Sequence, residues 1–304
     1  MLLKIAKTTA LVALTTFTLN AAEFNKQAEK DRLALIDYFE AKLKDPAANA
    51  STFFPYASQE ELKNSYFTDI KHQEFAKGNY SFNKDGKSQY DAINEFPPYE
   101  DAVYNGEDLY NKKFANGKSF ASCFPNPAIV GDYPYFDDNK GEVVTLTTAI
   151  NECLVNNGEK PWNAKKGKLA ELEAYFAYET REAGEKLDIK IPSEDAAQAY
   201  ERGKEYYYTQ RGYLKLSCAS CHVQGAGQRV RNEKLSPFLG QVTHFPVYRL
   251  KWQGLGTLER RMAGCVKDAG QVPPKPDSKE MKELLYFMAY MSNGMSVDGP
   301  DIRK

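Results

Sequence analysis

Apolar residues recur at helical spacing in several stretches of the chain, and these stretches predict a mainly helical protein. Residues 30–43 read KDRLALIDYFEAKL and predict an amphipathic helix. The apolar residues on its face are Leu35, Ile36, Phe39 and Leu43. Residues 278–294 read SKEMKELLYFMAYMSNG and predict a second helix, with a serine to begin it and a glycine to end it. Between Pro46 and Pro98 the sequence has no clear period, so we expect an irregular covering segment.

Residues 1–22, MLLKIAKTTALVALTTFTLNAA, combine two lysines with an apolar stretch from Thr9 to Leu19. This layout is typical of a secretory signal peptide, with cleavage near Ala21 or Ala22. The stretch is too short to span a membrane, and no later apolar run reaches about 18 residues. We therefore predict an exported, periplasmic protein without a membrane span in its mature form. A retained N-terminal anchor is the alternative.

Charge is distributed unevenly along the chain. Without the segment 1–22 the sequence has 38 basic and 41 acidic residues, a net charge of −3. Between Arg202 and Lys267 there are twelve basic and three acidic residues, a net of +9, which leaves −12 for the remainder. This asymmetry indicates a site for an anion, although solvated lysines on a helix surface would give the same count. Nucleic acid is not expected as a partner, because an exported chain without a regular basic and aromatic stripe lacks such a surface.

Residues 218–222 read CASCH and indicate covalent haem. The two thiols are spaced to form thioether bonds with the haem vinyl groups, and the adjacent imidazole can bind the iron. A zinc site would need further Cys or His pairs, and a redox CxxC motif does not need the histidine. We therefore predict haem attachment at Cys218 and Cys221, with His222 as the proximal iron ligand.

Residues 120–124, FASCF, look like the same box with its first cysteine and its histidine replaced by phenylalanine. Aligning the boxes places Cys123 on Cys221, at an offset of 98. Downstream, AYFAY aligns with YFMAY and Cys153 aligns with Cys265, both at an offset of 112. Chance similarity of short strings is the alternative to a duplication. The agreement of the offsets predicts a tandem duplication whose first copy has lost its haem.

Each copy has the outline of a small cytochrome c domain, so we predict a mainly α fold with two tandem cytochrome c-like domains. The predicted parts are a signal peptide at 1–22, an N-terminal helix and covering segment at 23–98, a haem-free domain at 99–192 and a haem-binding domain at 193–304. In an oxidising compartment Cys123 and Cys153 can form a disulfide, which leaves Cys265 unpaired.

The residues alone leave the iron ligand opposite His222 open. The candidates are Met262, Met281, Met288, Met291, His244 and Cys265. Helical methionines more often fill a core, and His244 can equally be a loop histidine. Cys265 has the better claim, because the duplication places it where Cys153 would have faced the lost haem. If the surrounding segment is helical, Arg261 lies one turn away and favours a thiolate, whereas a free buried cysteine is the alternative.

The chain resembles the SoxA family, the larger subunits of the SoxAX cytochromes of bacterial sulfur oxidation. The resemblance rests on CFPN from Cys123, INEC ending at Cys153, the CASCH box and Arg261 four residues before Cys265. These motifs cover nearly the whole mature chain in the family's order. The resemblance implies two cytochrome c-like domains and a C-terminal haem held by His222 and by a Cys265 thiolate that is modified to a persulfide.

The resemblance also implies a reaction, in which thiosulfate is joined oxidatively to a cysteine of the carrier SoxYZ and two electrons leave through haem. It implies a heterodimer with the cytochrome SoxX, catalytic Cys265 and Arg261, and a substrate-binding arginine after the box, for which Arg229 and Arg231 both qualify. Because FASCF cannot hold haem, we expect the single-haem type, with one covalent haem c passing electrons directly to SoxX.

Three other functions are compatible with parts of this pattern. An electron-transfer cytochrome without a catalytic function would use Cys265 only as a ligand or as a structural residue. A haem-bearing structural subunit would use its basic face only to dock a partner. A di-haem peroxidase would need two haem boxes.

Overall fold

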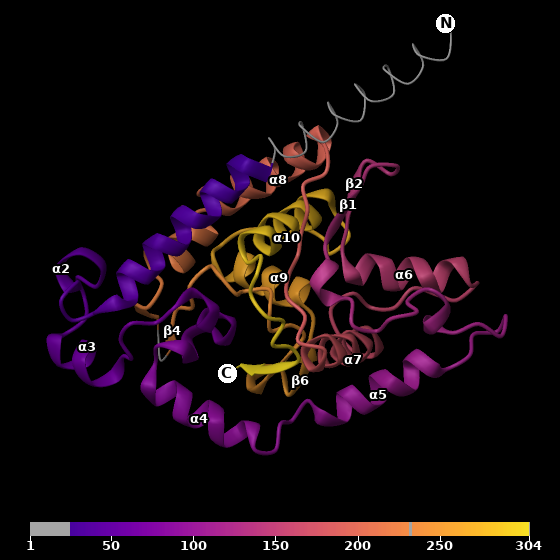
Figure 1. Cartoon of the computed structure of the whole chain (residues 1–304), viewed down its shortest axis with the longest axis horizontal. Helices are drawn as coiled ribbons and strands as arrows, with labels where there is room; N and C mark the ends of the chain where they lie inside the picture. Colours follow the sequence, from indigo (N-terminus) through magenta and orange to yellow (C-terminus); the bar gives the residue numbers. More distant parts are fainter. Residues whose placement is uncertain (1–24, 231–232, 304) are drawn as a thin grey trace, which may run out of the picture.

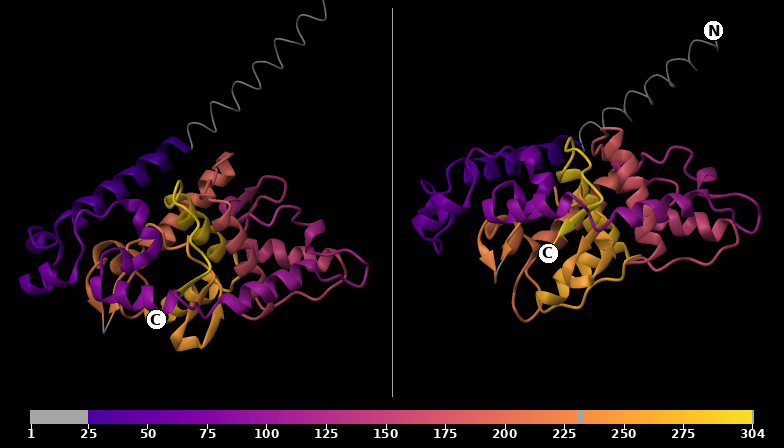
Figure 2. Two further views of the ribbon diagram at one scale, coloured as in Figure 1. Left: turned by 60° about the horizontal axis from the view of Figure 1, so that its bottom comes forward. Right: turned by 90° about the horizontal axis from the view of Figure 1, so that it is seen from below.

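The structure is a computed structural model that describes residues 25–230 and 233–303, and it is mainly helical, as the sequence predicts. The predicted signal peptide at 1–22 lies outside the described residues. Within the described ranges, no helix combines the length and apolarity needed to cross a membrane. Figures 1 and 2 show three parts of the chain side by side. Residues 25–83 (indigo to purple) and residues 100–182 (magenta to red) lie on opposite sides of the C-terminal residues 258–303 (yellow).

The predicted N-terminal helix is present and covers residues 25–44. Its apolar face, with Leu35, Ile36, Phe39 and Leu43, is buried in the core that it shares with the C-terminal helices. It lies beside α8 (Glu194–Tyr208), where Lys204 is 2.5 Å from Asp31 (Figure 1). The periodicity of the sequence was sufficient to find this helix because one face is fully apolar.

The covering segment is more regular than expected. It contains α2 (Ala50–Phe53), α3 (Gln59–Ser65), the 3₁₀ segment η1 (His72–Ser81) and α4 (Lys84–Asn94). The three α-helices each bury at most one residue, and η1 buries Phe75 and Tyr80, so no repeating apolar period marks these elements. The segment covers the loop after the haem box: the Tyr66 hydroxyl donates to the Gly227 carbonyl at 2.5 Å, and Asn79 donates to the Lys234 carbonyl at 3.0 Å.

The remaining chain contains two similar series of elements. The first is α5 (Glu100–Asn111), η2 (Phe120–Ser122), η3 (Val130–Asp132), β1 (Tyr135–Asp137), β2 (Glu142–Val144), α6 (Leu146–Asn156) and α7 (Lys168–Glu182). The second is α8, η4 (Ser220–Gln224), β3 (Arg229–Val230), β4 (Glu233–Lys234), β5 (Val247–Arg249), η5 (Leu250–Trp252), β6 (Gly254–Gly256), α9 (Leu258–Asp268), α10 (Lys279–Met291) and β7 (Asp301–Arg303). We call these series the first half and the second half.

Small antiparallel hairpins precede α6 and α9. In the first half β1 pairs with β2, and Phe136 lies opposite Val143. In the second half β5 pairs with β6, and the C-terminal β7 adds to β5 in parallel. The hairpins lead directly into helices that begin at equivalent threonines. Thr145 accepts from the Thr148 amide and Thr257 accepts from the Arg260 amide, so each side chain caps its helix.

The long helices of each half pack against each other through a glycine. A Cβ atom on Gly106 of α5 would lie 2.1 Å from the Glu171 carbonyl oxygen of α7. A Cβ atom on Gly203 of α8 would lie 2.1 Å from the Glu283 carbonyl oxygen of α10. Only glycine permits this approach, so the same helix contact is built twice.

Helix α10 confirms the predicted C-terminal helix. Ser278 caps its start by accepting from the Met281 amide, and Gly294 follows its end with a φ of 79°. All of its residues from Met281 to Met291 are buried. This helix forms the centre of the main core.

Candidate functional site

The haem box forms a compact turn after α8. Ser217 and Ser220 fix the turn through reciprocal hydrogen bonds, in which each backbone amide donates to the other hydroxyl at 3.1 Å. The next residues form η4, a single π-helical turn that carries Cys221 and His222. Such wide turns occur mostly at functional sites. The turn places Cys218, Cys221 and His222 at one surface of the second half.

His222 is oriented by the backbone that follows the box. Its Nδ1 lies 3.0 Å from the Ser236 carbonyl oxygen, which can only accept, so Nδ1 carries the hydrogen and donates. Burial lowers the pKa of His222 to about 4, the Ser236 contact opposes this change, and the positive charge of Arg261 adds to it. The imidazole is therefore neutral at neutral pH. Its Nε2 lone pair is the free donor for a metal.

Cys265 lies near both box cysteines, as the duplication predicts. Burial raises the pKa of the Cys218 thiol to about 12, and the charge of Cys265 adds to the increase. Burial and then Cys265 likewise raise the pKa of Cys221. None of the three forms a disulfide, and each residue is partly accessible. Cys265 therefore lies close enough to the haem box for its charge to act on both thiols.

Two arginines accompany Cys265. Arg261 is on the same helix, α9, which confirms the predicted helical spacing, and its Nη1 lies 4.0 Å from the position that a Cβ on Gly264 would take. Arg249 ends β5; burial lowers its pKa to about 10, the charge of Arg261 lowers it further, and the charge of Cys265 raises it. The site thus holds two mutually repelling cations beside a thiol, an arrangement suited to a dianion.

Arg249 was not found by the sequence analysis. The one sequence feature that could have pointed to Arg249 is the duplication, because at the offset of 112 Arg249 aligns with Asp137, a residue of opposite charge. Of the two arginines suggested by the resemblance, Arg231 lies outside the described residues. Arg229 is half-exposed on β3 and forms an ion pair with Glu61 of the covering segment at 3.0 Å.

The other candidate axial ligands have structural partners. Met281, Met288 and Met291 are buried in the core, and the Met291 sulfur accepts from the Tyr200 hydroxyl at 3.4 Å. Met262 is also buried in this core. His244 is buried with Nδ1 3.2 Å from the Ala76 carbonyl oxygen. These contacts support the interpretation of the methionines as core residues and of His244 as a loop histidine.

The donor set fits a covalently attached haem. Two thiols three residues apart would provide two attachment points, and a neutral imidazole whose Nδ1 is engaged and the sulfur of Cys265 on α9 would provide two iron ligands. Buried aromatic groups line the same region: Tyr207 stacks on Phe238 with ring centres 4.0 Å apart, and the nearby cysteines contribute to the raised pKa of its hydroxyl after burial.

The corresponding place in the first half is filled by protein. Cys123 and Cys153 form the predicted disulfide, with an S–S distance of 2.05 Å. Phe120 and Phe124, which replace the box cysteine and histidine, are buried. Phe120 contacts Phe114 and Trp162, and Phe124 contacts Phe176, with ring centres 5.0 to 5.3 Å apart.

The chain is similar to a family model and to several known proteins. The family model described as "SoxA/TsdA, cytochrome c domain" matches residues 105–184 and 202–297. The L-cysteine S-thiosulfotransferase subunit SoxA of Chlorobaculum tepidum is 45% identical over 298 residues, which cover 98% of this chain and 96% of that protein. The subunit of the same description from Allochromatium vinosum is 43% identical over 78% of this chain and 85% of that protein.

A solved structure is also similar. The crystal structure of SoxXA from P. pantotrophus contains a chain that matches with a TM-score of 0.62 and 32% identity, over 68% of this chain and 79% of that chain. These matches define a c-type cytochrome of the SoxA/TsdA group. The chain belongs to the SoxA family of L-cysteine S-thiosulfotransferase subunits.

Proposed function

We propose that this SoxA-family chain joins thiosulfate to a cysteine of a sulfur carrier in the periplasm, using one haem c bound through Cys218 and Cys221, with His222 and Cys265 as iron ligands. The observation that carries the proposal is the position of Cys265, which lies near both box cysteines and shares α9 with Arg261. An electron-transfer cytochrome has no need of a thiolate set among guanidinium groups. SoxYZ is the expected carrier.

The two arginines bind and orient the substrate. Thiosulfate is a dianion, and Arg261 and Arg249 offer fixed N–H donors for its oxygens. The pKa of Arg249, although lowered to about 10, keeps this group charged at neutral pH. Both cations bring the sulfane sulfur of thiosulfate to Cys265.

The sulfur chemistry is then a two-step transfer at Cys265. A bond forms between the Cys265 sulfur and the sulfane sulfur, and two electrons are released. A haem held by Cys218, Cys221 and His222 would supply the electron acceptor, and a partner cytochrome would receive these electrons. A carrier thiolate attacks the sulfane sulfur, the bond to Cys265 breaks, and Cys265 leaves as a thiolate. In sum, carrier thiol and thiosulfate give the carrier S-thiosulfonate, one proton and two electrons. In the persulfide form of Cys265 that the resemblance implies, the outer sulfur would accept the sulfane sulfur.

We also infer that the two halves are tandem cytochrome c-like domains and that only the second holds haem. The equivalent threonine caps and the repeated glycine contacts support the duplication. The buried Phe120 and Phe124 support the loss of the first haem. Electrons then pass from the single haem directly to the cytochrome partner, for which SoxX is the expected chain, since the similar solved structure is a SoxXA complex.

Electron paramagnetic resonance of the haem-loaded protein tests this function. The wild type should show a low-spin thiolate signal and one haem per chain, and Cys265→Ala should lose both that signal and thiosulfate-dependent reduction of the partner cytochrome. Met288→Leu, which removes another candidate sulfur, is the control and should keep both. A spectrum that is the same in wild type and Cys265→Ala would leave an electron-transfer cytochrome as the better description.

A further inference from the structure

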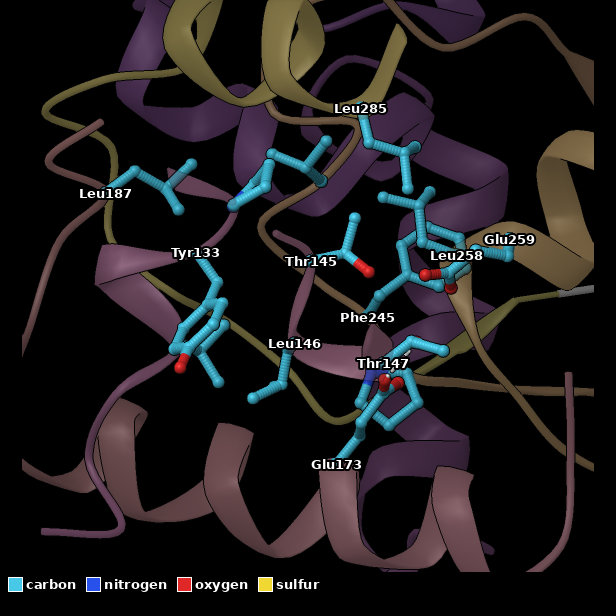
Figure 3. A pocket seen from close by; sticks show the side chains of 14 residues that line it. Tyr133, Thr145, Leu146, Thr147, Glu173, Leu187, Phe245, Leu258, Glu259 and Leu285 are labelled. Carbon is cyan, nitrogen blue, oxygen red and sulfur yellow. Dashed lines mark hydrogen bonds between the residues drawn. The ribbon is translucent and has the colours of Figure 1, made fainter. Parts of the chain in front are cut away.

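A cavity of about 80 Å³ lies between the two halves (Figure 3). Its lining comes largely in matched pairs, related by the same offset of 112 that aligns Cys153 with Cys265. Examples are Leu146 with Leu258, Thr147 with Glu259, and Glu173 with Leu285. The cavity therefore lies where equivalent surfaces of the two halves meet, but its carboxyl groups are not at equivalent positions.

The two carboxyls of this cavity are buried without a cation. Glu173 is 7% exposed and Glu259 is 3% exposed. Tyr133, from the loop before β1, is the other titratable residue of the lining, and no lysine, arginine or histidine is among the described residues that line it. The lining residues of α6 and α10 and of the loop before β5, where His244 is outside the lining, add no titratable group. Two carboxylates in such a place would repel each other strongly.

The hydroxyl of Thr147 lies beside the carboxyl of Glu173. It donates to Oε1 of Glu173 at 2.7 Å, and Glu259 lines the same cavity. Figure 3 shows Glu173 extending from α7 towards Thr147. Because this hydroxyl donates to Oε1, a proton held by Glu173 is on Oε2. Two carboxyls buried in one cavity whose described lining has no cation avoid repulsion when one of them is protonated.

The surroundings decide which carboxyl keeps the proton. Glu259 is in the first turn of α9, where its own backbone amide bonds to it and the helix dipole favours a negative charge. Burial raises the pKa of both carboxyls, and that of Glu173 lies well above 4.5. The charge of Glu259 adds to the increase at Glu173, and the hydrogen bond from Thr147 opposes it. Glu173 therefore holds the proton and Glu259 carries the charge.

We propose that Glu173 and Glu259 hold one proton between them in this cavity and thereby position the N-terminus of α9, the helix of Cys265 and Arg261, against the haem-free half. The same end of α9 is anchored by Thr257, whose amide donates to the Lys165 carbonyl at 3.3 Å and whose hydroxyl donates to the Ala164 carbonyl at 2.8 Å. Loss of the shared proton leaves two adjacent negative charges at this contact. The contact by which the first half holds the N-terminus of α9 therefore depends on this proton.

The pair makes the contact weaker at high pH. The native state holds the Glu173 proton more tightly than the unfolded chain, whose glutamates have a pKa near 4.5. Stability therefore falls as pH rises from about 4.5 through the native pKa of Glu173. A neutral amide at residue 173 removes this dependence and keeps the side-chain shape.

Infrared spectroscopy of the haem-loaded protein at pH 7 tests the shared proton. The wild type should show the carbonyl stretch of a protonated carboxyl, and Glu173→Gln should lose it. Glu171→Gln, on the same helix but outside the cavity lining, is the control and should keep it. Absence of the band in folded wild type, or its persistence in Glu173→Gln, would overturn the proposal.

The effect on α9 needs a second readout. The thermal midpoint of wild type, relative to that of Glu173→Gln at the same pH, should fall from pH 5 to pH 8. The low-spin haem signal should shift with pH in wild type and not in Glu173→Gln. The haem readout rests on the proposed ligation by Cys265, whereas the infrared and thermal readouts do not, so failure of the proposed function and failure of the shared proton are distinguishable. An unchanged thermal profile in Glu173→Gln would contradict the positioning effect.

Discussion

Cys123 and Cys153 are bonded to each other at the places in the first half that Cys221 and Cys265 hold in the second. In the second half the same two positions stay separate, and Cys265 acts on the pKa of Cys221 through its charge. The first pair is bonded within a core that contains Phe120 and Phe124, and the second pair includes Cys221 of the predicted haem box. On the proposed function, the equivalent positions serve structure in one half and chemistry in the other.

Removing the disulfide should lower stability without changing the haem. The bond links residues 30 apart, so the double variant Cys123→Ser and Cys153→Ser should lose about 3 kcal/mol in its free energy of unfolding. Urea unfolding of the haem-loaded variant measures this loss, and its low-spin resonance spectrum should match the wild type. A changed haem spectrum would contradict the separation between the structural half and the chemical half.

The arginines should differ in their effect on thiosulfate. Arg261→Ala and Arg249→Ala each remove a charged donor beside Cys265, so each should lower kcat/KM for thiosulfate about tenfold to hundredfold. Arg229→Ala is the matched comparison, because the charge of Arg229 is paired with Glu61 on the outer surface, and it should have a smaller effect. A larger loss in Arg229→Ala than in Arg249→Ala would favour Arg229 as the substrate-binding residue.

Sequence patterns identified the helices with one apolar face and the residues with special chemistry. The box, the disulfide and the spacing of Arg261 to Cys265 could be predicted because each depends on residue type at a fixed offset. Arg249 could not, since its proximity to Cys265 depends on how the β5–β6 hairpin folds back. The pairing of Glu173 with Glu259 could not be predicted either, because it also depends on the tertiary fold. These residues are on different helices and meet only when the two halves pack together.

The repeated helix contact predicts parallel losses on glycine substitution. Gly106→Ala and Gly203→Ala would each place a Cβ atom 2.1 Å from a carbonyl oxygen, so each should cost about 1 to 3 kcal/mol of stability. Only Gly203→Ala should also disturb the haem, because α8 leads into the box. Thermal unfolding and haem absorption of the two variants check this, and Gly264→Ala is a control in which the nearest neighbour is 4.0 Å away. An equal haem disturbance in Gly106→Ala would argue against independent helix pairs in the two halves.

The buried Lys42 should give the protein a rise in stability at alkaline pH. Its amine is buried and donates to the carbonyls of Val223 and Gln224, directly after the haem box. Burial lowers the pKa of Lys42 to about 8. Between that pH and 10.5, the ordinary value, the unfolded chain binds the proton and the native state releases it. The free energy of unfolding should therefore rise with pH in this window, by at most about 1.4 kcal/mol per unit.

Lys42→Met removes this titration and should lose the rise, which urea unfolding at pH 8 and pH 10 would measure relative to wild type. Lys44→Met changes an exposed lysine on the same helix and should keep the wild-type difference between the two pH values. If Lys42→Met keeps it as well, the native pKa of Lys42 is not lowered. The carbonyls that Lys42 holds follow His222 in the chain, so a change in the low-spin haem spectrum of Lys42→Met at pH 7 would show that the N-terminal helix also supports the haem box.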